Sequence, residues 1–236
     1  MELSKTCDAG VVHTLDPAYY TSDAIYQQEC FGLFMYTWQF AGHVSQAPNP
    51  GDYFTFEIAG QSLFCIRNNN NVLNTFYNVC QHRGNPLVEE EKGQVRRFVC
   101  KYHSWAYMPD GELNFAPDQE DFPEGNPCGK LRLEELRCET FAGFVWVNMD
   151  PDCVSLQEYL GPIWDEWQAR DIHLWRRTMA NTMWLPCNWK VVLDNFNESY
   201  HVPTVHMGAT TETNRKEIRG HINTYFKLRP RIYYSI

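Results

Sequence analysis

Short alternating patterns dominate the middle of the chain, and helical patterns lie on either side of them. Between Asp52 and Asp150, segments such as DYFTFEIAG, SLFCIR, VLNTFYNV and GFVWVNMD alternate or form short apolar runs between turn residues, which predicts antiparallel strands. The four asparagines at 68–71 suit a hairpin loop that requires positive φ. We therefore expect an all-β domain built of hairpins here.

The flanking segments predict helices and divide the chain into three parts. Ser22 is a suitable N-cap for a helix that runs from about this residue to Phe40, and helical patterns return beyond DPDCVSLQEYL. We expect an N-terminal helical segment at 1–42 that packs on the C-terminal part, a β domain at 43–152 and a third part at 153–236. The expected fold class is α+β.

Composition excludes several classes of function. The chain has 236 residues, 44% hydrophobic, and a formal net charge of −9, which argues against a nucleic-acid partner. No apolar run approaches the roughly 18 residues that a membrane span requires. The N-terminus lacks the hydrophobic core of a signal peptide, so a cytoplasmic location is expected. The nine cysteines are then expected to be reduced, and close Cys/His clusters point to metal ligation or catalysis.

Two Cys/His pairs follow predicted strands. Cys80 and His82 form C-x-H, and Cys100 and His103 form C-x-x-H seventeen residues later. Structural zinc sites usually pair like with like, so the mixed pairs favour a two-iron cluster. In such a cluster two thiolates hold one iron and two imidazoles hold the other, which is a Rieske [2Fe–2S] centre. A zinc-binding interaction module is the alternative.

A second histidine pair lies near the C-terminus. Apolar residues recur at helical spacing from Trp189 to Tyr200 and predict a buried stripe, with Asp194, Glu198 and His201 on another face. His201 and His206 are five positions apart, about 140° around a regular helix, so both cannot face one metal on an unbroken helix. Pro203 disfavours helix at Val202 and turns the chain, which lets His206 return beside His201.

These motifs resemble the Rieske-type non-haem iron ring-hydroxylating oxygenases, in their α subunits, over about residues 20 to 207. The resemblance rests on CQHRG, CKYHSWAY with DGEL, FAGFVWVNMDPD, and NWK followed by ESYHVPTVH. Respiratory Rieske proteins carry two further cysteines where this chain has Asn85 and Tyr102. Lys101 stands where proline is common in the family, and Ser104 where glycine is common.

The resemblance implies a ligand set and a domain for each metal. Its Rieske domain would bind [2Fe–2S] through the four box residues. The start of a helix-grip (START-like) catalytic domain would follow, with His201 and His206 on a mononuclear Fe(II). Glu198 matches the carboxylate that links this iron to a Rieske histidine of a neighbouring subunit. The third iron ligand of the family, an Asp, lies further downstream, so the expectation is an α subunit truncated at its C-terminus and inactive alone.

The resemblance also implies a function. Electrons would come from NAD(P)H through a separate ferredoxin and/or flavin reductase, and O₂ would be incorporated into a small organic substrate, as in aromatic hydrocarbon catabolism. Either mono- or dioxygenation is open. The expected assembly is a homotrimer, with or without a β subunit. Two alternatives stay open: a monooxygenase or demethylase of a quaternary amine such as carnitine or betaine, because some such enzymes carry Glu at the position of Glu198, and a Rieske electron carrier only.

Overall fold

The computed structural model describes residues 15–175, 183–197 and 201–205. The chain divides into two units, one formed by residues 1–25 with 181–236 and the other by residues 26–180. We name the second the β unit, because it holds all the strands of the described residues. The first is named the terminal unit.

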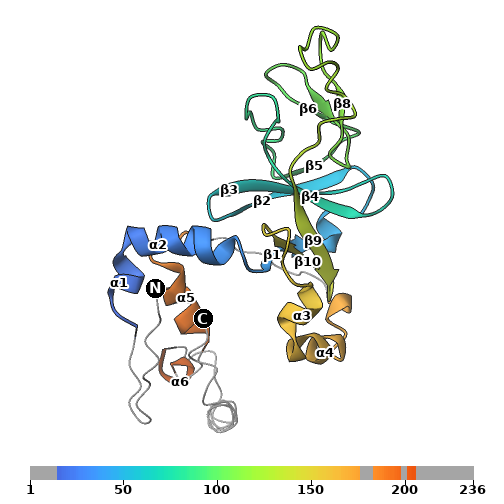
Figure 1. The fold of residues 1–236 in the computed structure, drawn as a ribbon. Helices are drawn as coiled ribbons and strands as arrows, with labels where there is room; N and C mark the ends of the chain where they lie inside the picture. Colours follow the sequence, from blue (N-terminus) through green and yellow to red (C-terminus); the bar gives the residue numbers. More distant parts are fainter. Residues whose placement is uncertain (1–14, 176–182, 198–200, 206–236) are drawn as a thin grey trace. The chain divides into compact units, whose positions relative to one another are not determined.

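Within residues 26–175 the β unit contains two antiparallel sheets (Figure 1). The larger has the strand order β1-β10-β9-β4-β3-β2-β5, and the smaller has the order β6-β7-β8. The strands are β1 (Gln39–His43), β2 (Asp52–Ile58), β3 (Gln61–Arg67), β4 (Leu73–Tyr77), β5 (Lys92–Gln94), β6 (Phe98–Val99), β7 (Ala106–Tyr107), β8 (Leu113–Phe115), β9 (Glu135–Phe141) and β10 (Phe144–Asn148). The expected all-β domain of hairpins is therefore confirmed.

Helices lie at the two ends of the described chain. They are α1 (Ala18–Thr21), α2 (Asp23–Glu29), a π-helical turn (Cys30–Phe34), α3 (Leu156–Leu160), α4 (Pro162–Gln168), α5 (Trp189–Phe196) and α6 (Val202–Val205), with 3-10 turns at Val44–Gln46 and Ile172–Leu174. The Ser22 hydroxyl accepts a hydrogen bond from the Ile25 amide at 3.4 Å, as an N-cap does. None of the helices in the described ranges has the length and apolar character needed to cross a membrane.

The helix expected from Ser22 to Phe40 ends early. Its last turn is π-helical, and Phe40 lies in β1, where it pairs with Trp146 of β10. The Phe40 ring also makes edge contacts with Phe144 and Trp146 at centroid distances of 5.4 and 6.0 Å. Pairing with the open edge of β10 therefore outcompetes the local helical preference.

A second difference concerns QVRRFVC, which the pattern predicts as one strand. Gln94 ends β5 and pairs with Asp52 of β2, whereas Phe98 begins β6 and pairs with Tyr107 in the smaller sheet. The chain thus changes sheets between these strands. As a result, Cys100 lies in the loop between β6 and β7.

The main core of the β unit lies between the two sheets. Buried aromatic side chains from both meet there, among them Phe64 and Phe76 of the larger sheet and Phe98 and Tyr107 of the smaller. Cys80 and Cys100 belong to the same cluster. A separate cluster joins Trp38, Phe141 and Leu156 of α3, with Trp164 and Trp167 of α4 packed against it. Helices α3 and α4 lie at the opposite end of the unit from β6 and β8 (Figure 1).

Two glycines with positive φ allow a prediction about stability. Gly60, in the β2–β3 turn, has φ +76° and open space around an added Cβ, whereas a Cβ on Gly51 (φ +87°) would meet the carbonyl oxygen of Val95. The Val95 amide donates to the Gly51 carbonyl at 2.9 Å, so this backbone cannot withdraw without losing a hydrogen bond. We expect Gly60→Ala to cost about 1 kcal/mol in the free energy of unfolding and Gly51→Ala roughly 2 kcal/mol more.

The measurement is urea denaturation followed by tryptophan fluorescence for the two variants in parallel. Gly60→Ala is the matched control, since it carries the conformational cost without the clash. Equal midpoints for the two variants would contradict the steric explanation.

Candidate metal centre

Two loops of the same backbone design carry the predicted Rieske ligands. In the first, the Cys80 amide donates to the Asn85 carbonyl at 2.9 Å, and the Cys80 carbonyl accepts from the Gly84 amide at 2.9 Å. In the second, the Cys100 amide donates to the Trp105 carbonyl at 2.8 Å, and the Cys100 carbonyl accepts from Ser104 at 3.0 Å. Each loop therefore closes on its cysteine with the same offsets of five and four residues.

The fourth residue after each cysteine adopts the left-handed conformation. Gly84 has φ +72° and Ser104 has φ +61°. Glycine takes this conformation without a Cβ penalty, which explains why glycine is common at the Ser104 position in the family that the chain resembles. Ser104 therefore carries local strain that the surrounding hydrogen bonds must offset.

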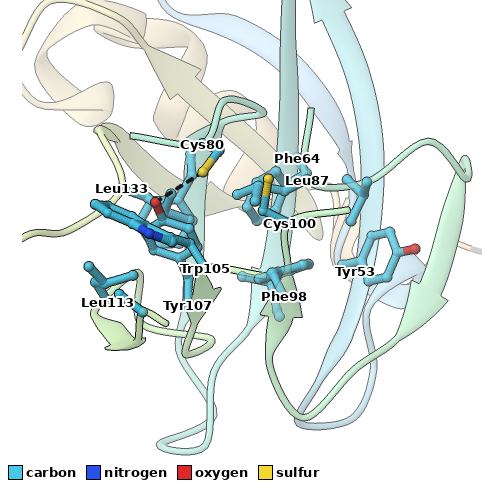
Figure 2. Close-up of a cluster of buried hydrophobic side chains, with 14 residues drawn as sticks. Tyr53, Phe64, Cys80, Leu87, Phe98, Cys100, Trp105, Tyr107, Leu113 and Leu133 are labelled. Carbon is cyan, nitrogen blue, oxygen red and sulfur yellow. Dashed lines mark hydrogen bonds between the residues drawn. The ribbon is translucent and has the colours of Figure 1, made fainter. Parts of the chain in front are cut away.

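The two cysteine side chains lie in the core between the sheets. Each residue is 2% exposed, and burial raises the pKa of the Cys80 thiol, with the neighbouring Cys100 adding to the rise. The Tyr107 oxygen is 3.3 Å from the Cys80 sulfur (Figure 2). It also accepts the Gln81 amide at 3.1 Å, so its own proton is free to point at the sulfur. Burial and this sulfur contact both raise the pKa of Tyr107, which therefore stays a hydrogen-bond donor.

The two histidine rings also lie next to each other. The centroids of His82 and His103 are 4.7 Å apart at 68°, and Trp105 stacks on His82 at 4.7 Å and 9°. Tyr102 packs on the other ring, with 3.8 Å between the centroids of Tyr102 and His103. Desolvation and the nearby His103 lower the pKa of His82, which keeps this imidazole neutral.

One nitrogen tests whether these residues fit a metal cluster. His82 Nδ1 is buried without a hydrogen-bond partner in the described part of the chain. A buried polar atom normally has a partner, and a neutral imidazole nitrogen with a free lone pair is a metal ligand. Within the described ranges, His, Cys, Asp and Glu side chains do not gather in threes as they would around a single ion. A pair of thiols and a pair of imidazoles supplied by the same two loops instead fits a two-iron cluster, in which each iron takes two protein ligands.

The second predicted site falls only partly within the described residues. His201 is half-buried and begins the turn of α6, where its carbonyl accepts the Thr204 and Val205 amides at 3.0 and 2.8 Å. Glu198 and His206 lie outside the described residues. Val202 begins α6 and Pro203 follows as its second residue, so the expectation that Pro203 disfavours helix at Val202 is wrong. Proline is tolerated there because first-turn amides have no helical acceptor.

Helix α5 precedes this site in the terminal unit. Asn188 caps it by accepting the Lys190 amide at 3.0 Å. The expected buried stripe is only partly present, because Trp189 and Val192 are half-buried whereas Phe196 is 80% exposed. On the other face, Asp194 accepts a hydrogen bond from Tyr20 of α1 at 2.7 Å.

Sequence reasoning missed three residues that support the centre. Trp105 and Tyr107 belong to the second box, CKYHSWAY, but the spacing of the box does not show that they contact the proposed ligands. Asn78 is buried and precedes the first box. Its side-chain Oδ1 accepts hydrogen bonds from the Leu87 and Val88 amides at 2.9 and 3.0 Å. An asparagine inside an apolar run, as in TFYNV, is the signal that could have identified it.

The Tyr107 contact yields a prediction about reduction potential. Tyr107→Phe removes the O–H donor to the Cys80 sulfur, and a hydrogen bond to sulfur favours the reduced, more negative state of a cluster. We expect the potential to fall by roughly 40 mV, equivalent to about 1 kcal/mol for one electron. A redox titration followed by visible absorbance measures the shift.

Tyr53→Phe is the matched control. Tyr53 lies in the same core, but its hydroxyl points away from both sulfurs (Figure 2). The reduction potential of the cluster in the Tyr53→Phe variant should therefore stay near that of the parent protein. A shift as large as that of Tyr107→Phe would assign the effect to general core disturbance.

Comparisons with known proteins cover most of the chain. Residues 37–136 match the family model "Rieske [2Fe-2S] domain", and residues 166–235 match "Ring hydroxylating alpha subunit (catalytic domain)". The chain is 34% identical over 200 residues to the carnitine monooxygenase oxygenase subunit of Escherichia coli, covering 83% of this chain and 52% of the relative. It is 34% identical over 204 residues to the biphenyl 2,3-dioxygenase α subunit of Rhodococcus jostii, covering 80% and 42%.

Solved structures give the same result. A quaternary ammonium Rieske monooxygenase in complex with an inhibitor superposes with a TM-score of 0.78 at 30% identity, over 84% of this chain and 56% of that chain. Naphthalene 1,2-dioxygenase from Rhodococcus sp. superposes with a TM-score of 0.69 at 29% identity, over 78% and 43%. The chain spans about half the length of the curated relatives it matches.

Proposed function

Because the chain belongs to the Rieske-type ring-hydroxylating oxygenase α subunits, we propose that this protein is the terminal oxygenase component of a multicomponent oxygenase. The observation that carries the proposal is the pairing of Cys80 with Cys100 and of His82 with His103 at the ends of two loops of like design.

We assign the four box residues as cluster ligands. Cys80 and Cys100 would hold one iron of a [2Fe–2S] cluster, and His82 and His103 the other. The neutral His82 ring, with its unpaired buried Nδ1, is ready to bind metal without losing a hydrogen bond. When bound, such a cluster would accept and release one electron at a time, and a mononuclear iron would activate O₂. Tyr107 and Trp105 would orient two of the ligands and keep water from them.

We place the mononuclear iron on His201 and His206, with Glu198 as the carboxylate that orients the first of these and joins the two metal sites. The match of residues 166–235 to the catalytic domain supports this placement. The proposed domains are those expected from the sequence: 1–42, the Rieske domain at 43–152 and the catalytic part at 153–236. The hydrogen bond from Tyr20 to Asp194 supports packing of the N-terminal segment on the catalytic part.

Two substrate classes follow from the relatives, and the quaternary amines are favoured. The structure with the TM-score of 0.78 is a quaternary ammonium monooxygenase, whereas naphthalene dioxygenase reaches 0.69. A carnitine monooxygenase subunit is also among the relatives. An aromatic hydrocarbon is the second candidate, because the biphenyl dioxygenase subunit is as similar in sequence. The proposed partners are a separate NAD(P)H-dependent reductase, alone or with a ferredoxin, and further copies of the chain in a trimer.

Reconstitution tests the proposal. The protein is loaded with iron and sulfide under anaerobic conditions, reduced by NADH through a Rieske-oxygenase reductase, and supplied with O₂ and either carnitine or biphenyl. We expect a red-brown protein with a Rieske EPR signal, and a form with a complete catalytic domain should convert carnitine. A protein that binds zinc and stays colourless would contradict the cluster. If the form with the complete catalytic domain is reduced but yields no product from either substrate, the result would favour the electron carrier.

A further inference from the structure

In each ligand loop, the residue that follows the cysteine makes a contact outside its own loop. In the first loop this residue is Gln81, whose amide donates to the Tyr107 oxygen at 3.1 Å. In the second loop it is Lys101, whose Nζ donates to Glu89 Oε2 at 2.7 Å. Tyr107 follows the second loop in the sequence and Glu89 follows the first. Each contact therefore joins one loop to the segment that follows the other.

The tip of the second loop depends on this contact more than the first loop does. Backbone hydrogen bonds close the loop at Cys100, but the backbone of residues 101–103 makes no hydrogen bond within the described part of the chain. Tyr102 is 59% exposed and packs on His103, so the two rings belong to the same tip. The Lys101 side chain therefore supplies the hydrogen bond that ties this tip to another segment.

Glu89 lies on a segment whose backbone is fixed on both sides. Before it, the Asn78 side chain donates to the Val88 carbonyl at 2.7 Å and accepts the Val88 amide at 3.0 Å. Val88 is buried in the core that also holds both box cysteines. After it, the Thr55 amide of β2 donates to the Glu91 carbonyl at 2.8 Å. The exposed Glu89 carboxylate therefore extends from a fixed backbone position.

Because the ion pair is exposed, we expect its effect to be local. The Lys101 and Glu89 side chains are 62% and 60% exposed, and ion pairs of this kind contribute little to global stability. A folded protein also opens locally, and a contact between two segments opposes the opening that separates them. Each iron of the proposed cluster takes one ligand from each loop, so the cluster leaves only when the loops separate.

We propose that Lys101 is a positioning residue, whose ion pair with Glu89 holds the tip of the second loop in place and slows release of the cluster. The inference rests on the proposed cluster ligands. The ion pair keeps His103 beside His82, whose ring centroids are 4.7 Å apart. Lys101 thus does for the second loop what the Gln81 amide does for the first.

Rates of cluster release test the inference. The protein is loaded with iron and sulfide under anaerobic conditions, excess EDTA is added, and the decay of visible absorbance is followed. Lys101→Met removes the charge and keeps most of the side-chain length, and Glu89→Gln keeps the shape of the carboxylate. We expect each variant to release the cluster roughly threefold to fivefold faster than the parent protein. A parent-like rate in both variants would overturn the inference.

A second ion pair of similar geometry serves as the matched control. Arg170 lies 2.8 Å from Glu166, with side chains 63% and 55% exposed, and neither residue belongs to a ligand loop. Arg170→Met should therefore release the cluster at the parent rate. Release as fast as in Lys101→Met would assign the effect to the loss of any surface charge and would overturn the inference.

Rescue separates the ion pair from packing of the lysine stem. Lys101→Arg keeps the cation and should release the cluster at the parent rate. Lys101→Glu combined with Glu89→Lys restores an ion pair of reversed direction and should release it more slowly than Lys101→Glu alone. Failure of both rescues would overturn the inference.

Ionic strength gives an independent readout. Raising the salt concentration from about 0.05 M to about 0.5 M should accelerate release from the parent protein, because salt screens exposed charges. The rate of Lys101→Met should change little. The same salt dependence in both proteins would contradict a role for the ion pair.

Two further measurements distinguish the possible failures. Urea midpoints should agree between the parent protein and Lys101→Met, and a clearly lower midpoint in the variant would replace the local effect by general destabilisation. A parent protein that never binds the cluster would overturn the proposed function together with this inference. A loaded parent with the same release rate as Lys101→Met would overturn this inference alone.

Discussion

Cys80→Ser is expected to abolish the visible spectrum and the EPR signal of the cluster. Serine keeps the size of the side chain but removes the thiolate that one iron requires, and a two-iron cluster has two protein ligands on each iron. The site is buried at 2% exposure, so water cannot easily take the place of the missing ligand. His103→Ala should have the same effect, since it removes one of the two imidazoles.

The measurements are visible absorbance, EPR of the reduced protein, and iron and sulfide content after anaerobic reconstitution. Cys187→Ser is the control, because Cys187 is an exposed free thiol of the terminal unit. It should load the cluster like the parent protein. A parent-like signal from Cys80→Ser would show that the ligand assignment is wrong.

Glu198→Gln is expected to separate metal binding from turnover. In a chimaera that joins this chain to the remaining catalytic domain of a relative, the variant should keep the cluster and most of the mononuclear iron. Product formation should nevertheless fall by roughly ten- to a hundredfold, because groups that orient a metal ligand have effects of this size. The amide keeps the shape of the side chain and removes its negative charge.

The readouts are the cluster spectrum, iron content and product formed per NADH consumed. Glu217→Gln is the matched control, since its carboxylate lies after both histidines in no recognised motif. It should leave turnover unchanged. Near-normal turnover of Glu198→Gln with both metals loaded would remove Glu198 from the proposed route.

The local sequence was sufficient for the hairpins and the ligand loops. Alternation along β2 and β3 predicts strands because side-chain direction repeats every two residues, and this holds whatever the strand later pairs with. The spacing of the first box likewise predicts that Cys80 and His82 lie on the same loop. The left-handed conformation at Ser104 could not be read from its own residue type, because serine rarely adopts it.

Wherever partners come from distant parts of the chain, local patterns were not enough. The sequence pattern predicts that Phe40 ends a helix. In the structure it pairs instead with the edge of β10, more than a hundred residues away in the sequence. The sequence pattern predicts one strand through Gln94 and Phe98. In the structure Gln94 belongs to the larger sheet and Phe98 to the smaller. Phe196 belongs to the apolar stripe of α5 in the sequence, yet it is 80% exposed in the described structure.

The sequence alone led to the proposed metal ligands, because ligand chemistry depends on residue type and short spacing. Only the tertiary structure decided that Tyr107 meets the Cys80 sulfur and that Trp105 stacks on His82. It likewise decided that Cys65 and Cys138, 73 positions apart in the sequence, share one cluster. Such pairs depend on strand order and register across a sheet, and hydrophobic periodicity specifies the face of a strand but not its neighbour.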